Sequence, residues 1–225
     1  MVNELAGRVA IVTGGASGFG SGLVEKFARE GARVLIADVD EESGEKLAAA
    51  LGPDSCFRRT DVSDPGQLAA LVAAAIERFG ALDVMVNSAA LPSETRQGLL
   101  DDDLEDFHRV MAVNLLGVMA GTRDAARRMA AAGGGSIINV VAVGEGDPAT
   151  YRACKAAVVQ FTRSAAIELA PHKVRVNAIA PGGISPLPLT PSGGQEAAAD
   201  VAEAALYLAG ERSRYVTGTV LPLGG

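Results

Sequence analysis

Residues 9–20 read VAIVTGGASGFG, so that an apolar run leads directly into a glycine-rich turn. The run 9–12 is uninterrupted and contains β-branched side chains, which is typical of a parallel strand buried on both faces. Gly14 permits a tight turn, Gly18 lets the backbone approach an anion, and Gly20 allows a following helix to pack against the strand. The stretch therefore predicts a strand, an anion-binding turn and the start of a helix, in preference to a turn that binds nothing.

The same alternation of short apolar runs and longer alanine-rich stretches continues along the chain. It favours parallel strands joined by crossover helices. We predict strands at residues 9–13, 33–38, 55–59, 82–87, 136–141, 175–178 and 218–223. We predict helices at residues 18–30, 41–51, 65–79, 103–131, 149–169 and 195–209. The expected fold class is α/β: a doubly wound parallel sheet of seven strands with helices on both faces (a Rossmann fold), forming a single domain over residues 1–225.

Composition narrows the classes of partner. The formal net charge is −7 and the isoelectric point is about 4.9, whereas nucleic acids and anionic membranes require clustered Lys and Arg. Cys56 and Cys154 have no metal-ligand spacing with His108 or His172, so we expect reduced thiols and no bound metal. No apolar stretch is long enough for a membrane span, and the N-terminal residues do not resemble a signal peptide. We therefore expect a cytoplasmic protein whose partner is a small molecule.

An acidic residue ends the second predicted strand. Asp38 follows Gly20 by 18 positions, where a carboxylate accepts hydrogen bonds from the hydroxyls of an adenosine ribose. It would also repel a 2′-phosphate, so we expect NAD rather than NADP as the cofactor. Arg33 lies at the opposite end of the same strand and is too far away to neutralise such a phosphate. The alternative that Asp38 caps the next helix is weaker, because Asp40 lies closer to that helix.

Tyr151 and Lys155 are four residues apart in a predicted helix, so they lie on one face and are neighbours in space. A phenol with a pKa near 10 is a poor acid or base at neutral pH unless a cation stabilises its phenolate, and an adjacent ammonium does this. Such a pair is common in helices and usually has no function. Here it follows the fifth strand, whose carboxyl end should border the cofactor pocket.

Together these features resemble the short-chain dehydrogenase/reductase family, and the resemblance covers essentially the full chain. The matching motifs stand in the family's order: the turn at residues 13–20, Asp61 and Val62 after the third strand, NSAA at residues 87–90, Asn114, YRACK at residues 151–155, Pro181-Gly182 and the tail at residues 215–222. Agreement of all these motifs at once is highly specific.

The resemblance implies roles for individual residues. Tyr151 would be the catalytic acid or base, Lys155 would hold the nicotinamide ribose and lower the tyrosine pKa, and Asn114 would support a water that connects the lysine to solvent. The cofactor would be bound by Gly14, Ser17, Gly18, Phe19, Gly20, Asp38, Asp61, Val62, Asn87, Ser88, Ala89, Ala90, Tyr151, Lys155, Pro181, Gly182 and Ile184. The resemblance also suggests a homotetramer or dimer built through helices 103–131 and 149–169. Taken alone, Asn114 would more often be a buried amide satisfied by backbone groups.

The main departure from the family concerns catalysis. Residues 137–142 read IINVVA, and Ala142 stands where the family places a serine whose hydroxyl polarises the substrate carbonyl. Loss of one such donor typically costs about 10²- to 10³-fold in rate. Thr150 is the only nearby hydroxyl besides Tyr151, and as the neighbour of Tyr151 it should point to another face of the helix.

Other departures concern the rim of the cleft. The interval from Ala142 to Tyr151 is about four residues shorter than the family usually shows, and only residues 184–194 separate Pro181-Gly182 from the next helix. The latter segment contains three prolines, so we expect no helical lid there. Ala90 replaces a glycine and should crowd the cofactor slightly. Cys154 is interpreted as a small packed residue and not as a nucleophile.

Two functions are therefore compatible with the sequence. The first is an NAD-dependent oxidoreductase that interconverts a secondary alcohol and a ketone, because Tyr151, Lys155 and Asn114 occur together. The second is a catalytically silent nucleotide-binding protein, a redox sensor or an assembly partner, because Ala142 replaces the serine. A methyltransferase or flavoprotein with the same glycine turn would leave the Tyr–Lys pair unexplained.

Overall fold

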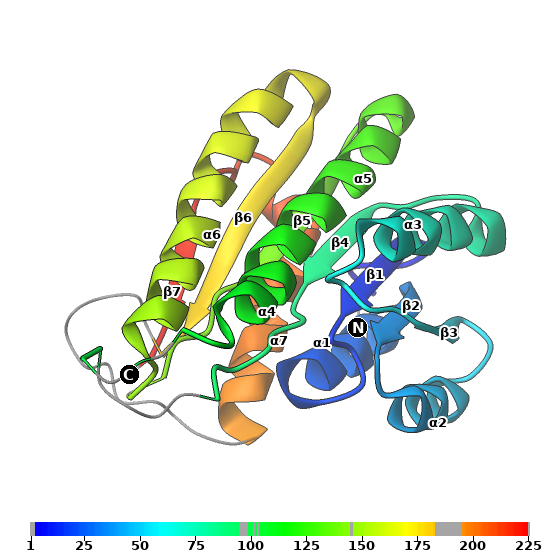
Figure 1. Cartoon of the computed structure of the whole chain (residues 1–225). Coiled ribbons are helices and arrows are strands. Elements are labelled where there is room, and N and C mark those ends of the chain that lie inside the picture. The colour runs from blue at the N-terminus through cyan, green and yellow to red at the C-terminus, as the bar shows by residue number, and fades with distance from the viewer. Residues whose placement is uncertain are drawn as a thin grey trace.

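The computed structural model describes residues 3–94, 99–100, 102, 104–144, 146–182 and 195–224. Within these residues the strands form one seven-stranded sheet in the order β3-β2-β1-β4-β5-β6-β7, with every neighbouring pair parallel (Figure 1). The strands are β1 (Val9–Thr13), β2 (Arg33–Asp38), β3 (Ser55–Arg59), β4 (Val84–Asn87), β5 (Gly135–Val140), β6 (Val174–Pro181) and β7 (Val220–Leu223). This arrangement confirms the predicted α/β fold class.

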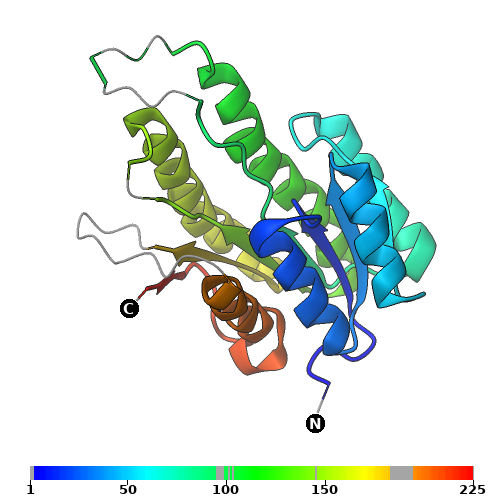
Figure 2. The same ribbon diagram turned by 90° about the horizontal axis from the view of Figure 1, so that it is seen from below.

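Helices connect the strands and cover both faces of the sheet (Figures 1 and 2). They are α1 (Gly18–Arg29), α2 (Glu41–Leu51), α3 (Pro65–Phe79), α4 (Phe107–Met111), the π-helical turn η1 (Ala112–Leu116), α5 (Gly117–Ala132), α6 (Ala149–Leu169), the 3₁₀ turn η2 (Ala170–His172), α7 (Gln195–Ala209) and the 3₁₀ turn η3 (Glu211–Ser213). No helix in the described part of the chain is both long and apolar enough to cross a membrane.

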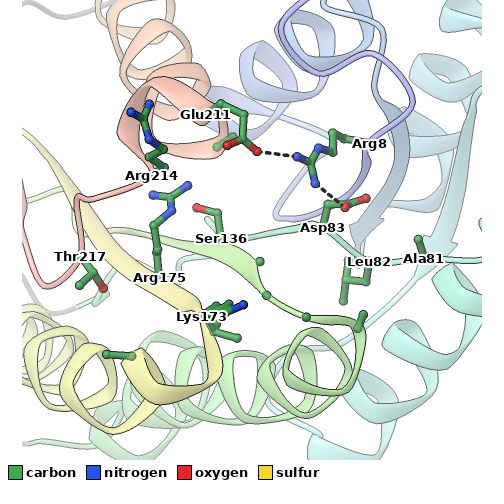
Figure 3. A pocket seen from close by; sticks show the side chains of 18 of the residues that line it. Arg8, Ala81, Leu82, Asp83, Ser136, Lys173, Arg175, Glu211, Arg214 and Thr217 are labelled. Atoms are coloured by element: carbon green, nitrogen blue, oxygen red, sulfur yellow. Dashed lines mark hydrogen bonds and ion pairs between the residues drawn. The ribbon is translucent and has the colours of Figure 1, made fainter.

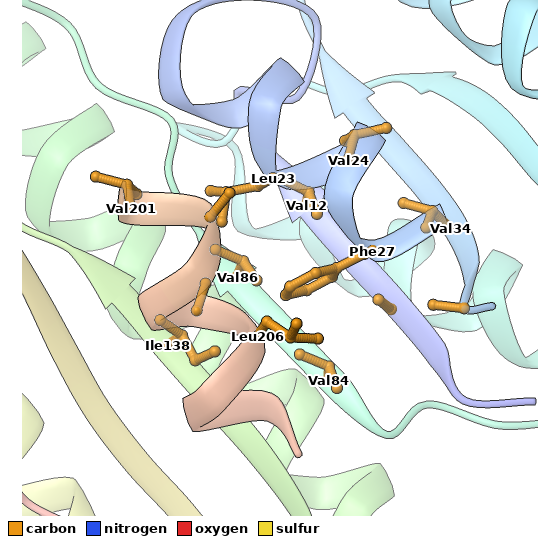
Figure 4. Close-up of a cluster of buried hydrophobic side chains, with 14 of the residues drawn as sticks. Val12, Leu23, Val24, Phe27, Val34, Val84, Val86, Ile138, Val201 and Leu206 are labelled. Carbon is orange, nitrogen blue, oxygen red and sulfur yellow. The ribbon is translucent and has the colours of Figure 1, made fainter. Parts of the chain in front are cut away.

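The two faces of the sheet bury separate hydrophobic layers. Successive residues of a strand point to opposite faces. Accordingly Ala10 and Val12 of β1 pack with α1, α2 and α7, whereas Val9 and Ile11 pack with α3, α5 and α6. Figure 4 shows the first layer, in which the Phe27 side chain of α1 lies between β1, β4 and α7. Phe27 is fully buried, and its truncation to alanine would cost about 3–5 kcal/mol.

The predicted helix at residues 103–131 is wrong in its first part. Residue 103 lies outside the described residues, Leu104 has a left-handed φ of 58°, and α4 begins only at Phe107. The helical path is then widened by η1 before α5 continues to Ala132. A left-handed residue cannot continue a right-handed helix, so the chain enters α4 from a turn.

The other differences in boundaries are smaller. Strand β4 starts at Val84 and not at residue 82, and β7 starts at Val220 and not at residue 218, because Asp83 and Thr219 lie in the connections that enter these strands. Strand β6 extends three residues beyond the predicted end at Ala178, to Pro181, since its register with β7 continues as far as Leu223. The carboxyl ends of β1 and β4, where the strand order reverses, therefore meet at the edge where open α/β sheets bind their ligands.

Candidate functional site

The glycine turn after β1 is built by close backbone approaches. Gly14 has a φ of 64°, and a Cβ atom there would lie 2.7 Å from the Cα atom of Ala89. A Cβ atom on Gly20 would lie 1.9 Å from the carbonyl oxygen of Gly14, so any side chain would force the turn and α1 apart. Gly18 differs from both, because a Cβ atom there would meet nothing within 4 Å. Gly18 is the first residue of α1, and the preceding N-cap residue Ser17 forms no side-chain hydrogen bond to the helix.

A cavity of about 460 Å³ lies at this edge of the sheet. Its lining contains the predicted residues Gly14, Ser17, Gly18, Phe19, Gly20, Asp38, Asp61, Val62, Ser88, Ala89 and Ala90. The structure thus brings together side chains and backbone from four βα connections that are remote in sequence. A glycine turn at a helix N-terminus, an acid at the end of β2 and a hollow lined by both fit a dinucleotide.

The lining also includes residues that the sequence analysis missed, namely Val39, Thr60, Ser63, Leu91, Arg109 and Val113. Most of them are sequence neighbours of a predicted residue, and this proximity in sequence could have identified them. Arg109 and Val113 lie four positions apart on the helical segment that precedes Asn114, which places them on one face. The Arg109 guanidinium is not free, because it forms an ion pair with Glu94.

Asp38 links the end of β2 to the glycine turn. One carboxylate oxygen accepts a hydrogen bond from the backbone N–H of Ala16 at 3.0 Å, and the other accepts from the N–H groups of Val39 and Asp40 at 2.7 and 3.1 Å. The N-cap of α2 is Asp40, whose side chain accepts from the N–H of Ser43. The assignment of the cap to Asp40 is thereby confirmed, and Asp38 is left facing the cavity.

Thr13 joins β1 to the loop that follows β4. Its hydroxyl accepts hydrogen bonds from the backbone N–H groups of Ser88 and Ala89 at 3.1 and 3.3 Å, and donates to the carbonyl of Val86 at 3.3 Å. Ser88 and Ala89 are thus held against Gly14 across the mouth of the cavity.

Asn87 does not line the cavity. Its amide nitrogen donates to the Thr122 hydroxyl at 3.2 Å and to the Asn139 amide oxygen at 2.9 Å, and Asn139 in turn donates to the Thr162 hydroxyl at 2.9 Å. All four side chains are buried. This chain of hydrogen bonds ties β4 and β5 to α5 and α6, which supports the site from behind.

Asp61 and Val62 occupy the part of the cavity that follows β3. The Asp61 carboxylate accepts hydrogen bonds from the N–H and the hydroxyl of Ser63, at 2.9 and 2.6 Å. The backbone N–H of Asp61 donates to the side chain of Gln67 at 2.9 Å. The first turn of α3 therefore fixes this corner of the cavity.

Asn114 lies inside η1 and is completely buried. Its amide nitrogen donates to the carbonyls of Leu91 at 2.7 Å and Val110 at 3.0 Å, and its oxygen accepts from the N–H of Leu91 at 3.3 Å. Single π-helical turns occur frequently at functional sites. Here the side chain clamps the segment after β4, and Leu91 of that segment lines the cavity.

Tyr151 and Lys155 lie one turn apart near the start of α6, which packs against η1. Their side chains are 7% and 2% exposed, and the Lys155 ammonium nitrogen lies 5.3 Å from the centre of the Tyr151 ring. Burial raises the pKa of Tyr151 to about 12, with Asp147 and Cys154 adding to the effect, and burial lowers the pKa of Lys155 to about 8. The net effect of the surroundings in this structure is therefore to raise the pKa of the phenol.

The short segment before Tyr151 forms a compact turn. The Asp147 carboxylate accepts from the backbone N–H of Gly144 at 2.6 Å, and the Arg152 guanidinium donates to the carbonyls of Asp147 at 3.1 Å and Gly144 at 3.0 Å. Ala142 precedes this turn and is half-buried.

Pro181 and Gly182 end β6 beside that turn. A Cβ atom on Gly182, which has a φ of 78°, would lie 2.8 Å from the carbonyl oxygen of Val143. The segments that follow β5 and β6 are thus in close contact, but neither Pro181 nor Gly182 lines the cavity described above. Ile184 and the proline-containing segment 184–194 lie outside the described residues.

Comparisons with known proteins agree with this architecture. A family model described as short chain dehydrogenase matches residues 8–195. The chain therefore belongs to the short-chain dehydrogenase family, whose members are oxidoreductases that bind a nicotinamide cofactor, NAD or NADP.

Curated relatives match the chain over almost its whole length. The chain is 40% identical to momilactone A synthase of Oryza sativa subsp. japonica, with 99% of this chain and 90% of the relative covered. It is 36% identical to 2,5-dichloro-2,5-cyclohexadiene-1,4-diol dehydrogenase of Sphingobium indicum, with coverages of 100% and 98%. It is 38% identical to cis-4-hydroxycyclohexanecarboxylate dehydrogenase of Sinomonas cyclohexanicum, again with coverages of 100% and 98%. These similarities support an oxidoreductase that acts on alcohols.

Proposed function

We propose that the protein is an NAD(H)-dependent oxidoreductase that interconverts a secondary alcohol and a ketone, with Tyr151 as the acid or base. The observation that carries the proposal is the buried pair of Tyr151 and Lys155 on α6. The charge of a lysine residue that is only 2% exposed is costly to bury, and its retention beside a buried phenol supports a functional pair. The clamp between Asn114 and Leu91 connects the neighbouring η1 to the cofactor cavity.

The preference for NAD rests on Asp38. Its carboxylate faces the cavity at the end of β2 and would accept hydrogen bonds from the ribose hydroxyls, while repelling a 2′-phosphate. Neither Arg33, at the opposite end of β2, nor Arg109 of the cavity lining is free to offset this repulsion. Arg33 donates to the carbonyls of Phe79 and Gly7, and Arg109 pairs with Glu94.

A bound nicotinamide supplies the acceptor or donor of the hydride. The chain supplies the proton transfer: Tyr151 donates its phenolic proton to the ketone oxygen in reduction and accepts the alcohol proton in oxidation. At neutral pH its raised pKa keeps the phenol protonated, which is the form needed for reduction. Lys155, with a pKa of about 8, is largely protonated at the same pH and can donate to the ribose hydroxyls of the cofactor.

Ala142 offers no hydroxyl to polarise the substrate oxygen, so Tyr151 would be the main hydrogen-bond donor to that oxygen. We therefore propose a slow enzyme, because removal of one such donor costs about 10²- to 10³-fold in rate. The Asp147 carboxylate, held in the compact turn, adds negative charge beside Tyr151 and raises its pKa further. The raised pKa keeps Tyr151 in the protonated form that reduction of a ketone needs at neutral pH, whereas the missing hydroxyl slows both directions of the reaction.

A cyclic secondary alcohol is the substrate class we propose. Two of the relatives described above are named for the oxidation of a cyclohexadiene diol and of a hydroxycyclohexane carboxylate. The alignment with the diol dehydrogenase spans 247 positions against 225 residues here, so at least 22 positions of the alignment have no counterpart in this chain. We propose that the short sequence interval from Ala142 to Tyr151 accounts for some of these positions.

We further propose that the protein forms a homo-oligomer through α5 and α6. A groove of about 550 Å³ between these helices is lined by Leu116, Met119, Phe161 and Leu169, among other residues. Leu116 and Met119 are 45% and 40% exposed, and Ile167 of α6 is 77% exposed. A second copy of the chain is the occupant we propose, because burial of such an apolar helical face is the usual driving force of a symmetric dimer.

The rival function is a catalytically silent nucleotide-binding protein, which the absence of a serine at position 142 favours. An assay of NADH oxidation with a panel of cyclic ketones, and of NAD reduction with cyclic alcohols, separates the two functions. We expect turnover that Tyr151→Phe lowers by at least about 10²-fold, with NADH binding unchanged. Tyr207→Phe removes a hydroxyl from α7 and is the matched control, expected to retain the activity. Binding of NADH without turnover would favour the silent protein, and absence of NADH binding would exclude both.

A further inference from the structure

A second, larger hollow lies at the opposite edge of the sheet, where β1, β5 and β6 begin. Its volume is about 660 Å³, and the cofactor cavity shares no residue with it. Figure 3 shows that the charged side chains around it come from separate segments: Arg8 before β1, Asp83 before β4, Lys173 and Arg175 around the start of β6, and Glu211 and Arg214 after α7.

Both acidic side chains of this hollow are engaged by one cation. The Arg8 guanidinium donates to Asp83 at 2.9 Å and to Glu211 at 2.7 Å (Figure 3). The second carboxylate oxygen of Asp83 also accepts from the backbone N–H of Val9 at 2.8 Å. Little negative charge is thus left for the other cations that line the hollow.

Three other cations line the same hollow: Lys173, Arg175 and Arg214. Within the described part of the chain, none of them forms an ion pair with a carboxylate. Arg175 donates to the carbonyls of Val216 at 3.2 Å and Leu208 at 2.7 Å, and burial lowers its pKa. Arg214 lies over the ring of Tyr215, with 4.7 Å between the guanidinium carbon and the ring centre.

Helix ends explain part of this positive charge. The helices α5 and α7 both end at this hollow, and the carbonyls at a helix C-terminus attract cations. Arg175 serves that purpose, since it binds the carbonyl of Leu208 in the last turn of α7. Lys173 and Arg214 make no such hydrogen bond in the described structure, although the chain has 27 acidic residues against 20 basic ones. Like charges that share one hollow repel each other, and an anion between them would remove that repulsion.

We propose that this hollow binds a small anion of the phosphate class beside Lys173, Arg175 and Arg214. Arginine provides the planar, paired donors that match a phosphate group, and lysine adds a point charge. Tyr215, which is 87% exposed and also lines the hollow, offers an aromatic face to an organic group attached to the phosphate. This site is separate from the cofactor cavity and does not depend on the proposed activity.

Calorimetric titration with inorganic pyrophosphate tests the site, with the protein kept in saturating NADH so that the cofactor cavity is blocked. We expect saturable binding that weakens as the ionic strength increases. The double variant Lys173→Gln/Arg214→Gln should bind pyrophosphate at least about tenfold more weakly. Lys46→Gln/Arg58→Gln removes the same charge from exposed positions on α2 and β3, outside the hollow, and should bind as the wild type does.

A parallel titration with adenosine monophosphate examines the role of Tyr215. Tighter binding of the monophosphate than of inorganic phosphate, lost in Tyr215→Ser, is expected if the ring contacts the organic group. Absence of saturable pyrophosphate binding, or equal weakening in the two double variants, would overturn the proposal. Thermal unfolding of each variant identifies any loss of folding, and titration of NADH alone reports separately on the cofactor site.

Discussion

The Lys155 ammonium nitrogen lies 5.3 Å from the centre of the Tyr151 ring, and both side chains are almost completely buried. The ammonium faces the ring as a cation does in a cation–π contact. Burial has the largest effect on the pKa values of both groups. It raises the pKa of the phenol to about 12 and lowers the pKa of the ammonium to about 8.

This pair gives the stability of the protein a defined pH dependence. Between the lowered pKa of about 8 and the unperturbed value of 10.5, the unfolded chain binds more protons at Lys155 than the folded chain does. The free energy of unfolding should therefore rise with pH across this window, by about 2 kcal/mol between pH 8 and 10. The contribution of Tyr151 has the opposite sign and begins only above pH 10, where the unfolded phenol ionises first.

Denaturant unfolding at a series of pH values measures this effect as the difference between the wild type and Lys155→Met. Below pH 8 the difference between the two free energies of unfolding should change less steeply with pH, because Lys155 is increasingly charged in the folded as well as the unfolded chain. Parallel stability curves for the two proteins from pH 8 to 10 would contradict the lowered pKa of Lys155.

Restoring a hydroxyl at position 142 should increase the activity. We expect Ala142→Ser to raise kcat for ketone reduction by about tenfold or more, because a second donor to the substrate oxygen stabilises charge in the transition state. Ala142→Val, which adds bulk without a hydroxyl, is the control and should give no increase. An equal effect of both substitutions on kcat would show that packing and not hydrogen bonding is responsible.

The charge of Asp38 should determine the choice of cofactor. Asp38→Asn retains an oxygen that can accept from the N–H of Ala16 but removes the negative charge, so the ratio of NADPH to NADH affinity should increase by about tenfold. Asp40→Asn removes a charge two residues away, at the N-cap of α2, and should leave the ratio unchanged. Fluorescence titration with NADH and NADPH measures this ratio of affinities. An identical shift in the two variants would indicate a general electrostatic effect.

The groove between α5 and α6 should control assembly. Met119→Glu introduces a charge into this apolar face and should convert the oligomer to monomers, because burial of an unpaired carboxylate at an interface is strongly unfavourable. Ala73→Glu adds the same charge at an exposed position of α3, outside the groove, and should leave the oligomer intact. Size-exclusion chromatography with light scattering gives the mass of each variant. A monomeric wild type would exclude the proposed interface.

The sequence was sufficient to predict the sheet, several element boundaries and the grouping of cofactor residues, because these depend on local patterns. Hydrophobic runs, Pro65 behind the Asp64 cap and the glycine turn act within a few residues of the chain. The helix predicted at residues 103–131 was wrong in its first part because Leu104 is left-handed and α4 begins only at Phe107, which no local hydrophobic pattern signals. Likewise, the buried setting that raises the pKa of Tyr151 arises from segments that no local pattern brings together.

The π-helical turn η1 confines the effect of a change in chain length to its own turn. A π turn holds one residue more than an α turn for the same advance, so removal of a single residue from Ala112–Leu116 would allow a regular helix to form. Because the removed residue is the extra one, α5 would keep its rotation relative to α4, and buried Ala125 and Met129 would stay in the core. The turn that carries Asn114 to the carbonyl of Leu91 would be lost instead. A one-residue deletion within Ala112–Leu116 should therefore spare the packing of α5 but release the segment after β4.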